Sequence, residues 1–228
     1  MNPAVDFING ERLLINKPIG WTSFDVVNKI RIQLRSLLKT SIKVGHAGTL
    51  DPLATGLLIV CTGKFTKKLD EYQLHEKEYT GTFFLGATTP CFDLERAIDH
   101  HFPTDHISNE MIYETSKQFI GNIQQIPPIF SAVKVDGKRA YKKARRGEVA
   151  EIRAKEITIR EFEITNISMP LVEFRIVCGK GTYIRSVARD FGVALGSGAH
   201  LTSLCRTRIG TFSLKDSVSI TEFQNQLL

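Results

Sequence analysis

Two stretches of the chain alternate apolar and polar residues with a period of two, and this pattern constrains the fold more than any other feature. Every second residue of 79–85 and of 172–178 suits a buried face: Tyr79, Gly81, Phe83, Leu85, Val172, Phe174, Ile176 and Cys178. Because successive side chains of a strand point to opposite faces, each stretch predicts a strand with one buried side. Residues 157–167 are predicted to form a neighbouring strand.

Helical patterns occupy other parts of the chain. Residues 108–120 and 183–195 are predicted helices, and a last helix begins near Thr221. Another follows the turn at residues 17–21, where Thr22 or Ser23 supplies the N-cap. Since strands and helices do not alternate regularly, an α+β fold with a mixed, mostly antiparallel sheet is favoured over a doubly wound parallel sheet.

Composition excludes several classes of protein. The net charge of +6 favours a polyanionic partner, although only weakly. The four cysteines form no C-x-x-C pair, which argues against a zinc site and for reduced thiols in a cytoplasmic protein. No apolar run approaches the length of a membrane span, and the first residues do not resemble a signal peptide.

A glycine-rich segment, residues 44–58, contains the first candidate for chemistry. Its glycines and Pro52 predict a tight loop that leads directly into a buried segment. Asp51 in this loop suits a nucleophile or a general base, but a carboxylate that only stabilises a turn is the commoner case. His46 is likewise more often structural than catalytic. The segment from Gly56 to Lys64 has six residues between its glycines, too many for a phosphate-binding loop, so no nucleotide cofactor is expected.

Three further side chains have both a structural and a functional interpretation. Tyr79 suits a buried core position, yet an aromatic face also stacks on an extruded base. Tyr183 and Arg185 lie just after a glycine-rich turn, at a predicted helix start. Arg185 is able to pair with a carboxylate and keep it ionised, although an arginine on a helix surface is commoner.

The segment of residues 124–152 differs from the rest of the chain in charge. Between residues 134 and 146 it carries seven Lys and Arg side chains and one acidic side chain, Asp136, a net charge of +6. A preceding Pro-Pro pair and an Asp-Gly turn signal indicate a projecting insertion. Basic side chains on such an element bind phosphates, whereas the blander interpretation is a solvated charged surface. We call residues 124–152 the basic insertion.

Six motifs, in order from about Leu13 to Gly210, together resemble those of the TruB-type tRNA pseudouridine synthases. They are residues 17–23 (KPIGWTS), 45–56 (GHAGTLDPLATG), 77–86, 127–147, 181–185 (GTYIR) and 198–207. The resemblance implies the α+β catalytic fold of these enzymes and conversion of the T-loop uridine of tRNA to pseudouridine. This isomerisation needs no metal and no cofactor. In residues 88–93 the chain departs from the acid-rich block that many members carry there.

The resemblance also implies roles for individual residues. Asp51 would be the catalytic carboxylate, with Arg185 as its ionic partner and Tyr79 stacked on the flipped uracil. His46 would enter the vacated T-loop, and Lys17 would support the site or contact RNA. Tyr183 and Leu204 would line the base pocket. The basic insertion would bind the tRNA T-arm through five basic residues: Lys138, Lys142, Lys143, Arg145 and Arg146.

The organisation expected from the sequence is a single catalytic domain, residues 1–228, with the basic insertion and without a separate C-terminal RNA-binding domain. We expect a monomer that does not associate with membranes. Two other functions use the same features: a non-catalytic RNA-binding module or tRNA-folding chaperone, and a pseudouridine synthase that acts on ribosomal RNA. The module would need the basic insertion and the aromatic side chains but not Asp51 and Arg185 together.

Overall fold

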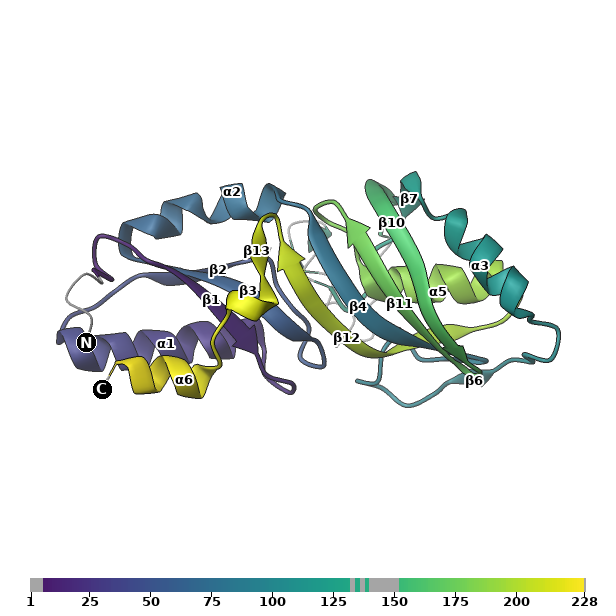
Figure 1. The fold of residues 1–228 in the computed structure, drawn as a ribbon, viewed down its shortest axis with the longest axis horizontal. Helices are drawn as coiled ribbons and strands as arrows, with labels where there is room; N and C mark the ends of the chain where they lie inside the picture. Colours follow the sequence, from purple (N-terminus) through teal and green to yellow (C-terminus); the bar gives the residue numbers. More distant parts are fainter. Residues whose placement is uncertain (1–5, 132–133, 136–137, 140–151, 228) are drawn as a thin grey trace. The chain divides into compact units, whose positions relative to one another are not determined.

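The computed structural model describes residues 6–131, 134–135, 138–139 and 152–227. The chain divides into two compact units. Unit 1 comprises residues 1–79 and 204–228, and unit 2 comprises residues 80–203. Strands β4 (Lys77–Leu85) and β12 (Ala199–Ile209) contribute residues to both units (Figure 1). In the described part of the chain, no helix is both long and apolar enough to cross a membrane.

The sheet of unit 1 is built around β3 (Thr55–Thr62). Strand β1 (Arg12–Lys17) pairs antiparallel with β3, and so does β2 (Val44–Ala47). On β12, Cys205 and Arg206 pair in parallel with Thr55 and Gly56. Residues 56–62 of β3 are all buried, as expected for an unbroken apolar strand covered on both faces. The short strand β13 (Phe212–Ser213) continues from β12 as an antiparallel partner.

The sequence predicted a loop at residues 44–58, and this prediction is too long at both ends. Its first residues form β2 and its last form β3, so that residues 48–54 alone connect the two strands. The glycines there serve strands as well as turns: Gly56 lies in β3 with φ 102°. A side chain at this position would meet the backbone of Arg206, because an ideal Cβ would lie 2.4 Å from the carbonyl oxygen of that residue.

Helices cover the sheet of unit 1. Helix α1 (Ser23–Leu38) begins at Thr22, whose side chain and that of Asp25 form a reciprocal capping box. Its buried residues Val26, Ile30 and Leu34 join a hydrophobic core with residues of β1 and β3. Helix α6 (Ile220–Gln226) adds Phe223 to this core, which confirms the predicted last helix. The 3₁₀ helix η1 (Gly63–Lys68) leads into α2 (Leu69–Leu74), and neither was predicted.

Unit 2 contains the three strands that the sequence predicted there, β4, β11 (Leu171–Cys178) and β10 (Lys155–Ser168), and two that it did not, β7 (Gly121–Gln125) and the first part of β12. The strand order is β12, β4, β11, β10 and β7. Strand β10 pairs antiparallel with both β11 and β7. With the parallel pairing of β3 and β12, this makes the sheet mixed but mostly antiparallel, as predicted. Two small hairpins, β5 (Ala87–Thr88) with β6 (His100–His101) and β8 (Lys134–Val135) with β9 (Lys138–Arg139), complete the described strands.

An aromatic core joins the sheet of unit 2 to helices α3 (Asn109–Lys117) and α5 (Ile184–Ala194). Phe83 of β4 stacks on Phe174 of β11 with ring centroids 4.2 Å apart. Phe191 of α5 lies 5.5 Å from Phe83 and 5.5 Å from Phe162 of β10. Phe119, just after α3, contacts Phe162 and Phe191. These rings fix α5, and with it Arg185 near the helix start, against the sheet (Figure 1).

The aromatic core predicts a large effect of Phe174→Ala on stability. Phe174 is buried, so its truncation removes apolar contact area and leaves a cavity. We expect the free energy of unfolding to fall by about 3–5 kcal/mol, measured by urea unfolding followed by circular dichroism. The matched control is Phe24→Ala, because Phe24 on α1 is 62% exposed and should cost about 0.5 kcal/mol or less. Equal losses in the two variants would contradict this account of the core.

Candidate active site

Asp51 lies at the middle of the loop that joins β2 to β3. The loop bends tightly because the backbone N–H of Ala54 donates to the carbonyl oxygen of Asp51 at 3.1 Å. Gly48, with φ 81°, begins the bend in a backbone region that favours glycine. The N–H of Gly20 donates to the carbonyl oxygen of Pro52 at 2.9 Å and ties the loop to the turn before α1. Asp51 itself is half-buried.

Ser23 fixes the residue before Asp51. Its Oγ accepts from the backbone N–H of Leu50 at 2.9 Å and donates to the carbonyl oxygen of Leu50 at 3.3 Å. The sequence offered Thr22 or Ser23 as the helix cap. Thr22 performs the capping, and this leaves the buried Ser23 hydroxyl to hold the loop. No sequence motif distinguished these two hydroxyl groups in advance.

Lys17 is fully buried beside the same loop. Its Nζ donates to the carbonyl oxygens of Pro18 at 2.9 Å, Trp21 at 2.6 Å and Pro52 at 3.3 Å. Burial lowers the pKa of Lys17 to about 8, the charge of Asp51 opposes this shift, and the charge of Arg206 adds to it. Of the two roles that the sequence left open for Lys17, a buried amine bonded to loop carbonyls suits support of the site rather than contact with RNA.

Arg206 is the second buried cation at this loop, and the sequence gave it no role. Its side chain is 1% exposed. Its Nε donates to the carbonyl oxygen of Leu57 at 2.8 Å, and its Nη2 donates to that of Gly48 at 3.1 Å. Arg206 therefore joins the beginning of the loop to the strand that follows it. The only signal in the sequence was its place in the motif at residues 198–207.

His46 lies on β2, two residues before the loop, where it pairs with Val60 of β3. Its side chain is half-buried, and its Nδ1 is buried without a hydrogen-bond partner among the described residues. Burial, followed by the nearby charge of Arg206, lowers the pKa of His46 below its ordinary value. This shift favours the neutral imidazole, and a backbone hydrogen bond to Gly48 opposes it in part.

Tyr79 and Leu204 lie on the strands at the limits of unit 1. Tyr79 is buried on β4, on the same face as Lys77, in agreement with the alternation in the sequence. Leu204 lies on β12 and is half-buried. Its carbonyl oxygen accepts from the Oγ1 of Thr55 at 3.4 Å, which holds this part of β12 to the start of β3.

Arg185 of unit 2 is buried at the start of α5 and held by several groups of its own unit. Its Nη1 donates to the carbonyl oxygen of Cys91 at 3.1 Å, and its Nη2 donates to that of Phe130 at 3.0 Å. Its Nε lies 3.5 Å from Oδ2 of the buried Asp93. Asp93 belongs to residues 88–93, where the chain departs from the family pattern, so the sequence gave no indication of this ion pair.

Tyr183 is the N-cap residue of α5 and is anchored by Gln125 at the end of β7. The backbone N–H of Tyr183 donates to Oε1 of Gln125 at 2.8 Å, and Nε2 of Gln125 donates to the carbonyl oxygen of Tyr183 at 3.2 Å. Gln125 is buried. It lies within residues 124–152, and its side chain serves this anchor, a role that the sequence did not reveal.

The basic residues of the insertion are largely beyond structural description. The backbone of Lys138 belongs to β9, which pairs with β8 as a hairpin. The predicted Asp-Gly turn at residues 136–137 lies outside the described residues, and so do Lys142, Lys143, Arg145 and Arg146. Their expected contact with tRNA stays a prediction.

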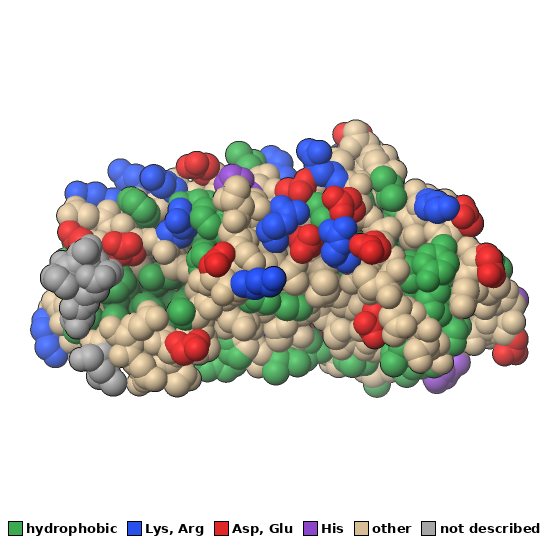
Figure 2. Space-filling model, viewed as in Figure 1, with side chains coloured by type: hydrophobic (Ala, Val, Ile, Leu, Met, Phe, Trp, Pro, Cys, Tyr) green, Lys and Arg blue, Asp and Glu red, His purple; other side chains and the backbone are tan. Residues whose placement is uncertain are grey.

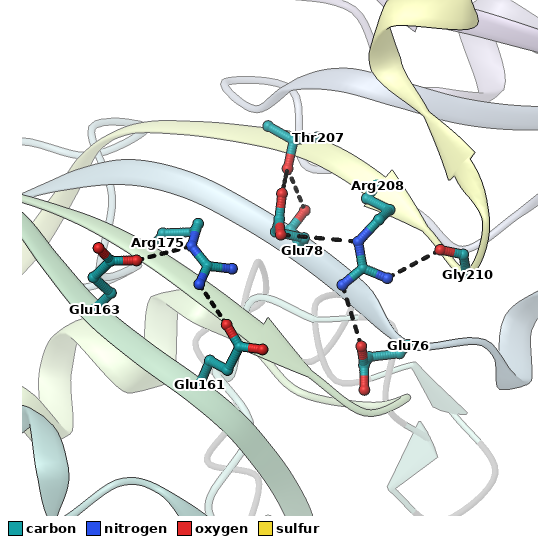
Figure 3. Close-up of polar contacts among 8 residues, drawn as sticks. All are labelled: Glu76, Glu78, Glu161, Glu163, Arg175, Thr207, Arg208 and Gly210. Atoms are coloured by element: carbon teal, nitrogen blue, oxygen red, sulfur yellow. Dashed lines mark hydrogen bonds and ion pairs between the residues drawn. The ribbon is translucent and has the colours of Figure 1, made fainter.

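Acidic and basic side chains intermingle on the face shown in Figure 2. Two networks within the separate units illustrate this (Figure 3). In unit 1, Arg208 contacts Glu76 at 3.2 Å and Glu78 at 3.8 Å. In unit 2, Arg175 contacts Glu163 at 3.0 Å and also bonds to Glu161. Both arginines therefore have carboxylate partners within the protein.

Comparison with known proteins gives matches along most of the chain. Residues 35–184 match the TruB family pseudouridylate synthase N-terminal domain, and residues 185–228 match the tRNA pseudouridylate synthase B C-terminal domain. The tRNA pseudouridine synthase B of Flavobacterium johnsoniae is 57% identical over 224 residues, which are 97% of this chain and 98% of that protein. That of Chloroherpeton thalassium is 46% identical over 223 residues, 96% of this chain and 91% of that protein.

Two solved structures have the same fold. A chain of a Cbf5–Nop10–Gar1 complex matches with a TM-score of 0.73 and 30% identity, covering 96% of this chain and 54% of that chain. A chain of an H/ACA RNP bound to a substrate RNA matches with a TM-score of 0.69 and 27% identity, with 96% and 54% covered. The present chain thus spans about half the length of these two solved chains.

The buried Lys17 predicts a specific pH dependence of stability. Because its pKa falls from 10.5 in the unfolded chain to about 8 in the native protein, the unfolded chain binds more protons between these values. The cost of burying the charge is therefore present at neutral pH and relieved as the pH rises through this window. We expect the unfolding free energy of the native protein, relative to Lys17→Met, to increase between about pH 7.5 and pH 10.

Urea unfolding at several pH values measures this difference. The exposed Lys215→Met variant gives the background pH dependence of a lysine substitution. A difference between native protein and Lys17→Met that does not change over the window would show that burial has not shifted the titration of Lys17.

Proposed function

The chain belongs to the TruB family of pseudouridine synthases and forms pseudouridine in the T-loop of tRNA, and we propose that Asp51 is the carboxylate on which this reaction depends. The family assignment sets aside the non-catalytic RNA-binding module and the enzyme for ribosomal RNA. The observation that carries the proposal is the hydrogen bonding of the Asp51 loop. Ser23 bonds to Leu50, and Lys17 bonds to Pro52. Arg206 bonds to Gly48 and to Leu57, so the backbone is held on both sides of Asp51.

The chemistry explains why such a carboxylate is needed. The reaction breaks the bond between uracil N1 and ribose C1′ and joins uracil C5 to C1′, while the C5 proton is lost to water and N1 gains a proton. No atom is gained or lost overall. An ionised carboxylate serves as the nucleophile, at the ribose or at the uracil ring, and holds one fragment while the base turns. The negative charge of Asp51 and the positive charge of the buried Lys17 attract each other.

The remaining site residues receive the roles that the family resemblance implies. Arg185 is the ionic partner of the carboxylate, and its anchoring by Cys91, Phe130 and Asp93 supports this role because a guanidinium so held keeps one direction. Tyr79 stacks on the flipped uracil. Tyr183, which Gln125 anchors, lines the base pocket with Leu204.

His46 enters the space that the flipped base leaves in the T-loop. Extrusion of a base costs a few kcal/mol of stacking and pairing, which a group that fills the vacated space partly restores. The half-buried imidazole supports this role, because burial lowers the pKa of His46 and thereby favours an uncharged ring that can enter among stacked bases.

The T-arm of tRNA is bound through the basic insertion, and Lys17 supports the site from within the protein. The similar chain of an H/ACA RNP bound to a substrate RNA supports RNA binding by this fold. We further propose that the enzyme acts as a monomer in the cytoplasm, where its tRNA substrate is present and where its free cysteines remain reduced. Residues 1–228 act together as one catalytic domain.

The assignment of Asp51 predicts that Asp51→Asn abolishes turnover. Asparagine keeps the size of the side chain but is neither a nucleophile nor a base, so we expect a loss of about 10²–10⁴-fold or more. Turnover is measured as tritium released to water from a tRNA transcript labelled at uracil C5. Binding of tRNA should stay within about 3-fold of the native protein, because one neutralised acid removes little of a phosphate-dominated affinity.

The control is Asp105→Asn, which changes an exposed aspartate of unit 2 and should leave turnover unchanged. A transcript that lacks the T-loop uridine should release no tritium. Native turnover in purified Asp51→Asn would refute the assignment of Asp51.

The basic insertion predicts a change in the salt dependence of tRNA binding. Replacement of Lys142, Lys143, Arg145 and Arg146 by Ala removes four positive charges, so we expect weaker binding and a salt slope reduced by about three. Filter binding over a range of KCl concentrations measures the slope. Lys117→Ala and Lys215→Ala, outside the insertion, serve as controls. An unchanged salt slope in the quadruple variant would show that tRNA binds to another surface of the protein.

A further inference from the structure

We propose that Arg206 is a positioning residue for catalysis, which holds the Asp51 loop in its reactive geometry. This inference rests on the proposed role of Asp51. Arg206 is buried and bonded to the carbonyl oxygens of Gly48 in the loop and of Leu57 in β3, so it acts through the loop. Nothing in the sequence motifs assigned it this role.

The geometry of the guanidinium matches the span that must be held. Its Nε and Nη2 donate to carbonyl oxygens of Leu57 and Gly48, which lie on either side of Asp51. Arginine presents its donors in a rigid planar fork, whereas lysine offers donors on a single atom. A lysine at this position would present all its donors at one point, so it would not reach the two carbonyls with the separation and direction of the guanidinium donors.

The backbone of β12 lies close enough to β3 for Arg206 to reach the loop. Arg206 pairs with Gly56, and an ideal Cβ at Gly56 would lie 2.4 Å from the carbonyl oxygen and 2.7 Å from the nitrogen of Arg206. Glycine at position 56 thus permits β12 to approach β3, and the approach brings the guanidinium to the loop. The family motif at residues 45–56 ends at this glycine.

Electrostatics gives the buried cation a second effect. Lys17 experiences the charges of both Asp51 and Arg206, which act on its pKa in opposite directions. The charge of Arg206 lowers the pKa of Lys17, so the two buried cations lie close enough to repel each other. Arg206 therefore acts on the second buried cation of the loop while it holds the backbone on both sides of Asp51.

Arg208 offers a matched control on the same strand. It lies two residues farther along β12 but bonds to Glu76, Glu78 and the carbonyl oxygen of Gly210 (Figure 3). Within the described part of the chain, these hydrogen-bond and ion-pair partners all lie outside the Asp51 loop. Arg208→Lys thus makes the same chemical change as Arg206→Lys, at a neighbouring arginine with different partners.

The test is single-turnover tritium release at 20 °C with enzyme in excess over labelled tRNA. For Arg206→Lys we expect the rate constant at saturating enzyme to fall about 10²-fold, the effect of a small displacement of a reacting group. The enzyme concentration that gives half the maximal rate should remain within about 2-fold, because the tRNA-binding surface is unchanged. Arg208→Lys should retain the native rate constant. Native rates in both variants would overturn the proposal.

The rate constant and the thermal stability together separate positioning from a purely structural role. Arg206→Gln removes the Nε donor as well as the charge, so the rate constant of the protein that remains folded at 20 °C should fall at least as far as in Arg206→Lys. A residue that acted only on stability would lower the melting temperature and leave the rate constant of the folded protein unchanged. Failure of both variants to fold cooperatively even at 10 °C would assign Arg206 to overall stability and overturn the proposal.

Asp51→Asn, measured in the same assay, distinguishes a failure of the role proposed for Asp51 from a failure of the role proposed for Arg206. If Asp51→Asn retains turnover, the proposed function of Asp51 fails whatever Arg206 does. If Asp51→Asn is inactive while Arg206→Lys reacts at the native rate, Asp51 keeps its role and only the inference about Arg206 fails.

Discussion

The arrangement of unit 1 depends on how the backbone polar groups of one short loop are satisfied. Residues 48–54 reverse the chain between β2 and β3, so their carbonyl oxygens cannot join a strand ladder. A buried carbonyl without a partner costs about 1–3 kcal/mol. Donors come instead from the Ser23 hydroxyl, the Lys17 ammonium, the Arg206 guanidinium and nearby backbone N–H groups. Each donor comes from a different part of the sequence, so the loop has this shape only when unit 1 is assembled.

Charged donors at such a loop have a consequence for chemistry. A neutral donor such as a serine would satisfy a carbonyl equally well, yet Lys17 and Arg206 bring two positive charges into the interior. Their burial is unfavourable in itself, as the lowered pKa of Lys17 indicates. The charge of Asp51 opposes the lowering of the Lys17 pKa, so a cation that is costly for stability lies where a carboxylate attracts it. In unit 2, the buried pair of Arg185 and Asp93 fixes a second guanidinium by similar means.

Much of the fold could be predicted from the sequence, because the spacing of apolar residues along a strand or helix is a local property. The strands β4, β10 and β11 and helices α1, α3, α5 and α6 follow from spacing and capping residues. The ends of the strands around Asp51 could not be predicted, because Gly45 and Gly56 are residue types typical of loops. Their place in strands is explained only by the close approach of Leu69 to Gly45 and of Arg206 to Gly56. Gln125, Asp93 and Arg206 were missed for a related reason, since their partners lie 58, 92 and 149 or more positions away. The roles of Asp51 and Tyr79 came from the resemblance to a family rather than from spacing.

Unit 1 is discontinuous in sequence, since residues 204–228 return to it after unit 2. Arg206, which donates to the carbonyls of Leu57 and Gly48, follows these residues by 149 and 158 positions in the sequence. At about 5–20 residues per second, ribosomal synthesis makes this a delay of several seconds at least. During that interval Asp51 and its loop exist without β12, so a strand made late in synthesis completes a loop that is made early. The nascent chain therefore cannot acquire its reactive loop before Arg206 has been synthesised.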